Sequence, residues 1–153
     1  RRLQSHLHVE MAEAATRRND YVESLRLAKL AAGYFESERV LQEMTVSMLN
    51  LKRNDEALAP IAELLARNPD SQMALRWQGM VYHRQNKMDL ALQSFQHCAD
   101  LGSAVCMNEV GAAYINGWGV APDKAKGLQY VKAAARLGER HAIESLKRHG
   151  ETY

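Results

Sequence analysis

Apolar and small residues recur at helical spacing along most of the chain, and short polar turns separate the runs. In residues 72–104, Leu75 and Gly79 lie about one turn apart on the same face of a predicted helix. After a polar turn, Ala91 and Phe95 define the inward face of a second helix. Gly79 and Ala91 are small, which lets two antiparallel helices approach closely. The pattern therefore predicts a hairpin of two helices.

The hairpin pattern repeats with a period of 34 residues. The matched positions fall in both helices, so the repeated unit is the whole hairpin. Pro69 closes the earlier unit, because proline cannot continue a helix. The matched pairs are Asp55 and Asp89, Ala57 and Ala91, Leu58 and Leu92, Ile61 and Phe95, Leu41 and Leu75, and Met48 and Tyr82.

Two of these units resemble the tetratricopeptide repeat (TPR), whose signature is a small residue, an aromatic three positions later, then alanine, an aromatic and proline. Residues 38–71 and 72–104 carry this pattern. Residues 4–37 keep the second helix, in "NDYVESLRLAKLA", but their first helix lacks the aromatic. The resemblance implies an all-α fold, a right-handed α/α solenoid in which helical hairpins stack on their neighbours.

A further unit contains "GAAYINGWGVAPDKAKGLQYVKAAARLG", whose turn between the helices is longer. This stretch resembles the Sel1-like repeat (SLR). The resemblance implies that Gly117 and Gly119 take positive φ in the turn and that Asp123 caps the second helix. Gly127 stands where the family usually has alanine, and we expect it to lower helix propensity. The matching residues are Gly111, Tyr114, Gly117, Gly119, Val120, Asp123, Tyr130, Lys132, Ala133, Ala134 and Gly138.

The repeats assign the whole chain, residues 1–153, to a single TPR/SLR solenoid domain. The last segment begins like another first helix and then stops, as a capping helix does. The expected boundaries are 4–37, 38–71, 72–104 and 105–139 for the four repeats and 140–149 for the cap.

Composition limits the classes of function. The chain is 46% hydrophobic and 25% charged, with a formal net charge of +2, which suits a folded domain. Acids and bases are mixed throughout the chain and no basic stripe is present, so we expect no nucleic-acid partner. No apolar run reaches the ~20 residues of a membrane span, and no signal-peptide pattern is present. The chain opens at Arg1 without methionine, which predicts a fragment or processed product and leaves open an anchor, signal or catalytic domain upstream.

No group of residues predicts catalysis. The six histidines lack the spacing of a metal site, with no HExxH motif and no paired-cysteine zinc motif, so we expect neither metal nor cofactor. A Ser/His/Asp triad is not excluded by spacing, but no nucleophile elbow is present. We therefore expect a protein that is not an enzyme. The alternative is an accessory repeat domain of a larger enzyme or regulatory protein whose active part lies upstream.

Two cysteines flank the turn between the third and fourth hairpins. Cys98 and Cys106 lie symmetrically around "ADLGSAV", so a disulfide between antiparallel neighbouring helices is feasible. The alternative is two small buried residues at alanine positions. Exported SLR proteins of bacteria use the same C-x7-C spacing. A bridge implies the bacterial periplasm or a membrane-associated site, and free thiols imply the cytoplasm.

The resemblance also implies where a partner binds. In TPR proteins the first helices of successive hairpins line a concave groove that holds an extended or helical peptide. The asparagines that grip acidic chaperone tails are replaced here by Ala12, Val46, Met80 and Ala112, so we do not expect that function. The expected groove residues are His8, Gln42, Asn50, Met73, Arg76, Met80, His83, Arg84, Asn108 and Asn116.

Trp77 and Trp118 are alternative contact sites for a partner, in place of the groove residues. For Trp77, the other interpretation is that it packs between hairpins. The prediction for function is a non-catalytic scaffold that binds another protein or a peptide segment. The resemblance places such scaffolds in bacterial envelope, secretion and exopolysaccharide assembly complexes. The oligomeric state stays open.

Overall fold

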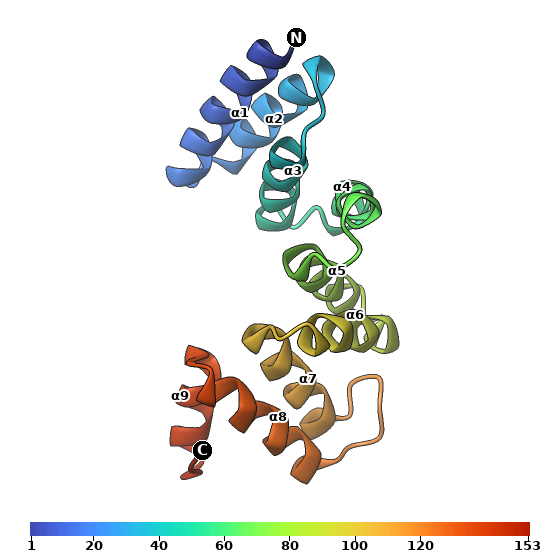
Figure 1. Cartoon of the computed structure of the whole chain (residues 1–153), viewed down its shortest axis with the longest axis vertical. Helices are drawn as coiled ribbons and strands as arrows, with labels where there is room; N and C mark the ends of the chain where they lie inside the picture. The colour runs from blue at the N-terminus through green and yellow to red at the C-terminus, as the bar shows by residue number, and fades with distance from the viewer. The chain divides into compact units, whose positions relative to one another are not determined.

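The protein is built from helices throughout. The computed structural model describes residues 1–153 and contains nine α-helices and no strand (Figure 1). The all-α prediction is therefore confirmed. The helices are α1 (Arg2–Arg17), α2 (Tyr21–Tyr34), α3 (Glu38–Asn50), α4 (Asn54–Arg67), α5 (Gln72–Arg84), α6 (Met88–Asp100), α7 (Ala104–Asn116), α8 (Lys124–Arg136) and α9 (Arg140–Arg148).

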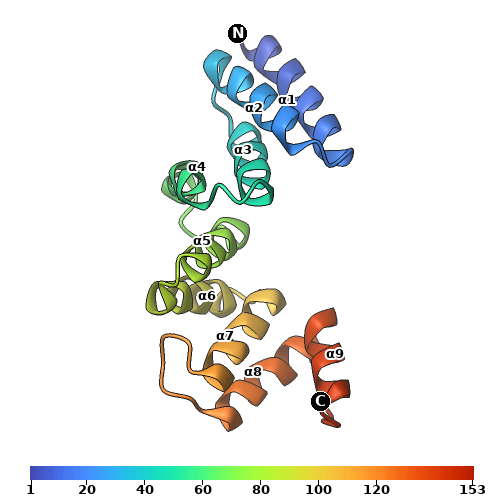
Figure 2. The same cartoon turned by 180° about the vertical axis from the view of Figure 1, so that it is seen from behind.

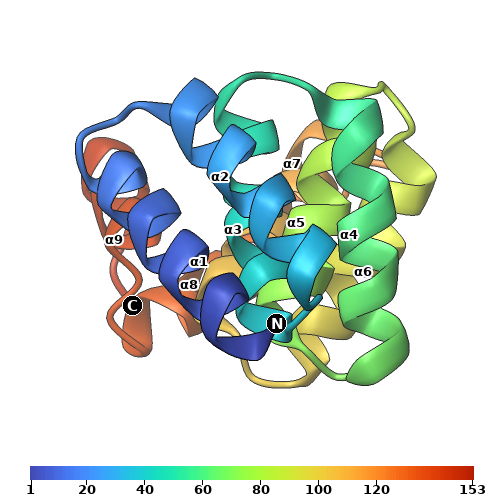
Figure 3. The same ribbon diagram turned by 90° about the horizontal axis from the view of Figure 1, so that it is seen from above.

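Contacts between helices divide the chain into two compact units, Arg1–Pro69 and Asp70–Tyr153. In the first unit α1 packs on α2, α2 on α3 and α3 on α4. Figure 3 shows α1 and α2 lying side by side as a hairpin. In the second unit α5 packs on α6, α6 on α7, α7 on α8 and α8 on α9. Within each unit, helices therefore pack mainly on their neighbours in sequence, as in a repeat protein.

The turns inside the hairpins have two forms. Three short turns each place one residue that is not glycine, namely Asn19, Lys52 or Asn86, at a positive φ of 59°, 58° or 60°. The turn between α7 and α8 is longer (Figure 2), with Gly117 at φ 75° and Gly119 at φ 72°. Positive φ at these two glycines confirms the expectation from the SLR resemblance.

Short polar side chains begin the first helices of the hairpins. Ser37, Ser71 and Ser103 precede α3, α5 and α7, and each hydroxyl accepts a hydrogen bond from a backbone N–H in the first turn. Asp123 caps α8 in the same manner, accepting from the N–H of Lys126 at 3.0 Å. The predicted cap is confirmed.

A polar network lies inside the first unit. Glu43 on α3 is only 8% exposed, and its Oε1 accepts hydrogen bonds from the hydroxyls of Thr16 and Ser24. The Ser47 hydroxyl donates to Ser24 Oγ at 2.8 Å. Met44 packs beside this network against two apolar clusters. The network links α1, α2 and α3, and it gives a buried carboxylate the hydrogen bonds that it needs.

Small residues lie where the helices of the second unit cross most closely. A Cβ on Gly79 would lie 2.7 Å from the Phe95 ring, so the glycine makes room for the aromatic side chain. A Cβ on Gly127 would lie 2.7 Å from the carbonyl oxygen of Gly111 and 2.6 Å from Ile115. The α7–α8 crossing therefore has no space for the alanine usual at position 127. This requirement outweighs the expected cost in helix propensity.

A disulfide joins the last two hairpins. Cys98 near the end of α6 and Cys106 near the start of α7 have their sulfur atoms 2.05 Å apart and their Cα atoms 5.8 Å apart. Both cysteines are buried, and neither thiol is free. The symmetric positions of the cysteines around the turn bring them together, because α6 and α7 are antiparallel neighbours.

Candidate protein-binding surface

The ten groove residues expected from the sequence lie on α1, α3, α5 and α7, the first helices of the hairpins. We call them the first-helix residues. In the first unit, His8 on α1 is half-buried and stacks on Tyr34, with ring centroids 5.3 Å apart. Gln42 on α3 is half-buried and donates to Glu38 Oε1 at 3.4 Å. Asn50 ends α3, and its Nδ2 donates to the carbonyl oxygen of Val46, one turn earlier, at 2.8 Å. These side chains already have contacts within the chain.

The first-helix residues of α5 form the most accessible group. Arg76 and Arg84 are exposed, and Met80 lies between them on the same side of the helix at i, i+4 and i+8. Met73 is 38% exposed, whereas Met80 and His83 are half-buried. This side of α5 therefore presents two cations and a deformable apolar side chain.

Asn108 and Asn116 are the first-helix residues on α7. Asn108 is half-buried, and Asn116 is exposed at the end of the helix. The Nδ2 of Asn116 donates to the carbonyl oxygen of Ala112 at 2.8 Å. Asn50 makes the equivalent bond at the end of α3, so an asparagine occupies the last position of two first helices and bonds back to the preceding turn in both.

The two tryptophans differ in exposure. Trp77 is only 8% exposed, which favours a packing role over contact with a partner. Trp118 is half-buried in the long α7–α8 turn and meets the ring of His83 edge to face, with centroids 4.8 Å apart. His83 is thus partly covered by a residue of the next hairpin, and of the two tryptophans Trp118 has more surface left for a partner.

Glu109 on α7 is not among the residues predicted from the sequence. Glu109 is half-buried beside Phe95, Trp118 and His83, in a small gap between α6, α7 and the long turn. Burial raises the pKa of its carboxyl above the ordinary range, although the charges of His83 and Arg76 act in the opposite direction. Helical spacing could have indicated that Glu109 is partly buried, because Glu109 lies about one turn from Cys106, which is buried.

A hollow of about 680 Å³ lies between α7, α8 and α9, and we call it the C-terminal hollow. The structure places Asn108 and Asn116 together on its wall, as two first-helix residues. Sequence reasoning missed the remaining lining, because it comes from three helices. The lining residues are Asn108, Ala112, Ile115, Asn116, Lys124, Leu128, Val131, His141, Ser145, Leu146, Arg148, His149 and Glu151.

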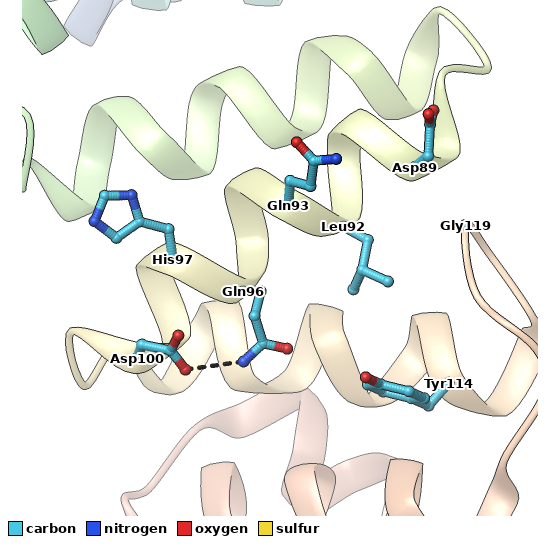
Figure 4. Close-up of a pocket in the computed structure, with 8 residues that line it drawn as sticks. All are labelled: Asp89, Leu92, Gln93, Gln96, His97, Asp100, Tyr114 and Gly119. Carbon is cyan, nitrogen blue, oxygen red and sulfur yellow. Dashed lines mark hydrogen bonds between the residues drawn. The ribbon is translucent and has the colours of Figure 1, made fainter.

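A second, more open hollow of about 470 Å³ lies along α6 and is closed at one end by Tyr114 and Gly119 (Figure 4). Its polar side chains do not point toward a common position in the hollow, because they bond separate partners. Gln96 donates to Asp100 at 2.9 Å, and His97 bonds Asp70 at 3.2 Å. In Figure 4, Gln96 and Asp100 point toward each other, whereas His97 points away from Tyr114. This arrangement is that of a solvated surface rather than a reaction site.

No group of three or more His, Cys, Asp or Glu side chains is placed to hold a metal ion. None of the nine helices combines the length and apolar character needed to cross a membrane.

Comparisons with known proteins rest on structure alone. No family model matches the chain, and no curated protein is similar to it at a significant level. A MamA structure titled "MamA RS-1 ArsTM double mutant" has a TM-score of 0.75 and 22% identity, covering 88% of this chain and 75% of that chain. MamA residues 41 to the end from Desulfovibrio magneticus RS-1 have a TM-score of 0.73 and 21% identity, covering 97% and 86%.

A Sel1 repeat protein from Oxalobacter formigenes has a TM-score of 0.61 and 20% identity, covering 94% of this chain and 45% of that chain. The chain has the TPR/Sel1-like repeat fold. The TPR/Sel1-like fold is an all-α solenoid of helical hairpins, so the predicted fold class is confirmed.

Proposed function

We propose that the protein is a non-catalytic scaffold that binds a partner protein through the first-helix residues. The observation that carries this proposal is the side of α5 on which exposed Arg76 and Arg84 flank half-buried Met80. Arginine offers a planar fork to carboxylate or backbone oxygens, and methionine adapts to varied apolar side chains. A partner segment lying along α5 meets both chemistries within about two helical turns.

We propose further that the scaffold works in an oxidising compartment, in a bacterial envelope complex for secretion or exopolysaccharide assembly. The disulfide between Cys98 and Cys106 supports this setting, because disulfides persist in the periplasm and are rare in the cytosol. The SLR resemblance supports it as well, since exported repeat proteins share the cysteine spacing. Identification by mass spectrometry of proteins that the intact chain captures names the partner.

The test of the binding surface is the double variant Arg76→Glu/Arg84→Glu, measured against the captured partner. We expect affinity to fall at least about tenfold, because two guanidinium contacts become repulsive. The control is Lys87→Glu/Arg136→Glu, which reverses two exposed cations outside the first-helix residues and changes the net charge equally. Circular dichroism and melting should show both variants folded. Unchanged affinity of the α5 variant would move the interface to the second helices or to the Trp118 turn.

A further inference from the structure

The C-terminal hollow combines an apolar floor with a basic rim. Its floor contains Leu146 and Val131, which are buried, and the partly buried Ile115 and Leu128. Helix α9 closes one side, held by the buried contacts of Leu146 and Ala142 with α8. The hollow is therefore a depression with an apolar base, large enough for an apolar side chain and the backbone on either side of it.

The rim is positively charged and unpaired. Lys124 begins α8 and Arg148 ends α9, and neither makes an ion pair or a side-chain hydrogen bond within the chain. Glu151 is the only acidic residue of the lining, and it pairs with Lys132 at 3.5 Å. The two cations on the rim thus lack an acidic partner, and a ligand can supply one.

Amide groups complete the site. The Nδ2 of Asn116 donates to the carbonyl oxygen of Ala112, which holds the side chain in place and leaves Oδ1 to accept from a ligand N–H. Asn108 lies two turns earlier on the same side of α7 and makes no side-chain hydrogen bond in the chain. A polypeptide backbone has the donors and acceptors that two such amides recognise.

From these features we propose that the C-terminal hollow binds an acidic segment of the partner protein, with an apolar residue on the floor and Asp or Glu side chains at Lys124 and Arg148. The proposal rests on the scaffold function above and names the chemistry of one contact. Two free cations are too few for a nucleic-acid backbone, which needs a longer basic stripe. A flat anionic membrane cannot reach the apolar floor. A polypeptide satisfies the apolar, amide and charged groups together.

A defined probe tests the proposal on the full chain. The probe is a fluorescein-labelled 12-residue peptide of Asp and Glu around two central leucines, and anisotropy measures its affinity. We expect Lys124→Glu/Arg148→Glu to weaken binding at least about tenfold and added salt to weaken it in the wild type. The matched control is Arg140→Glu/Lys147→Glu, which reverses the first residue of α9 and a residue of its last turn outside the hollow. The control should change affinity less than about twofold.

Changing the peptide instead of the protein tests the same contacts without any effect on the folding of the protein. Replacing both leucines by serine should weaken binding about tenfold or more, because the apolar floor loses its contact. A peptide with lysine at every acidic position should not bind. A labelled twelve-residue oligothymidine, or vesicles with anionic lipid, should bind more weakly than the acidic peptide. If oligothymidine or the vesicles bind as tightly as the acidic peptide, the proposal is wrong and the surface binds anions in general. The same holds if Arg140→Glu/Lys147→Glu loses as much affinity for the peptide as Lys124→Glu/Arg148→Glu does.

The same variants separate this proposal from the scaffold function. If the captured partner loses affinity for Arg76→Glu/Arg84→Glu but binds Lys124→Glu/Arg148→Glu normally, the scaffold function stands and the acidic-segment proposal is wrong. If the partner loses affinity for both variants and not for their controls, both proposals are supported.

Discussion

Gly111 and Gly127 face each other across the α7–α8 hairpin, and a Cβ on either one would lie less than 3 Å from the carbonyl oxygen of the other. The pair sets how closely the two helices approach. We predict that Gly127→Ala destabilises the protein by about 1–3 kcal/mol, because the added methyl group forces the helices apart. Urea denaturation followed by circular dichroism measures the change.

Gly33→Ala is the matched control for that substitution. Gly33 lies in α2, and a Cβ there meets no atom within 4 Å. Helix propensity then acts alone, and alanine should stabilise the protein by up to about 1 kcal/mol. A stabilising Gly127→Ala would contradict the close crossing and restore the simple expectation from propensity.

The disulfide predicts the thiol content of the purified protein. Protein isolated without reductant should show no free thiol by titration, and reduction should expose two, at Cys98 and Cys106. We expect the bridge to contribute about 2–3 kcal/mol, since it closes a short loop. Comparing unfolding of the wild type with Cys98→Ser/Cys106→Ser measures this contribution. Two thiols in protein isolated from an oxidising compartment would contradict the bridge.

Glu109 predicts a pH dependence of stability. Burial raises its carboxyl pKa, so the folded protein holds the proton more tightly than the unfolded chain. Its contribution to folding is therefore full at acid pH, below the unfolded pKa, and falls as the pH rises through the folded pKa. Glu109→Gln should remove this fall, so that the variant gains stability relative to the wild type between acid and neutral pH.

The control for Glu109 is Glu144→Gln. Glu144 is exposed on α9 and makes no ion pair in the structure. Its substitution should leave the pH profile of the melting temperature parallel to that of the wild type. The same parallel profile for Glu109→Gln would mean that the carboxyl is ionised as easily in the folded protein as in the unfolded chain.

We predict that Trp77 and Trp118 differ in emission wavelength and in their quenching by iodide. Trp77 is nearly covered, whereas Trp118 is half-buried in the long turn. In Trp118→Phe, the remaining emission should be shifted to shorter wavelength and resist quenching by iodide. In Trp77→Phe, the emission should be quenched more readily. The reverse order of quenching would show that Trp77, and not Trp118, is available to a partner.

The sequence was sufficient to predict the hairpins, because their period of 34 residues repeats in both helices. The roles of Asp123 and Gly117 were expected from the SLR resemblance, and they depend only on nearby backbone. Gly127 shows the limit of such reasoning. Its position relative to a family pattern suggested a small cost, whereas the contact with Gly111 across the hairpin requires glycine.

The candidate site was less predictable for the same reason. The first-helix residues follow from the TPR resemblance, but their burial does not, and His8 and His83 prove to be packed on aromatic rings. The C-terminal hollow needs Lys124 and Arg148, which belong to different helices and have no shared motif. Only the packing of α9 on α8 brings such residues to one rim.

Hydrogen–deuterium exchange of the intact protein, with and without its captured partner, tests the scaffold proposal most directly. Backbone amides covered by a partner exchange more slowly, so the protected segments locate the interface. We predict protection in α5 and α7, with little change in α4 and α6. Protection confined to the second helices, or to the long α7–α8 turn alone, would contradict binding through the first-helix residues.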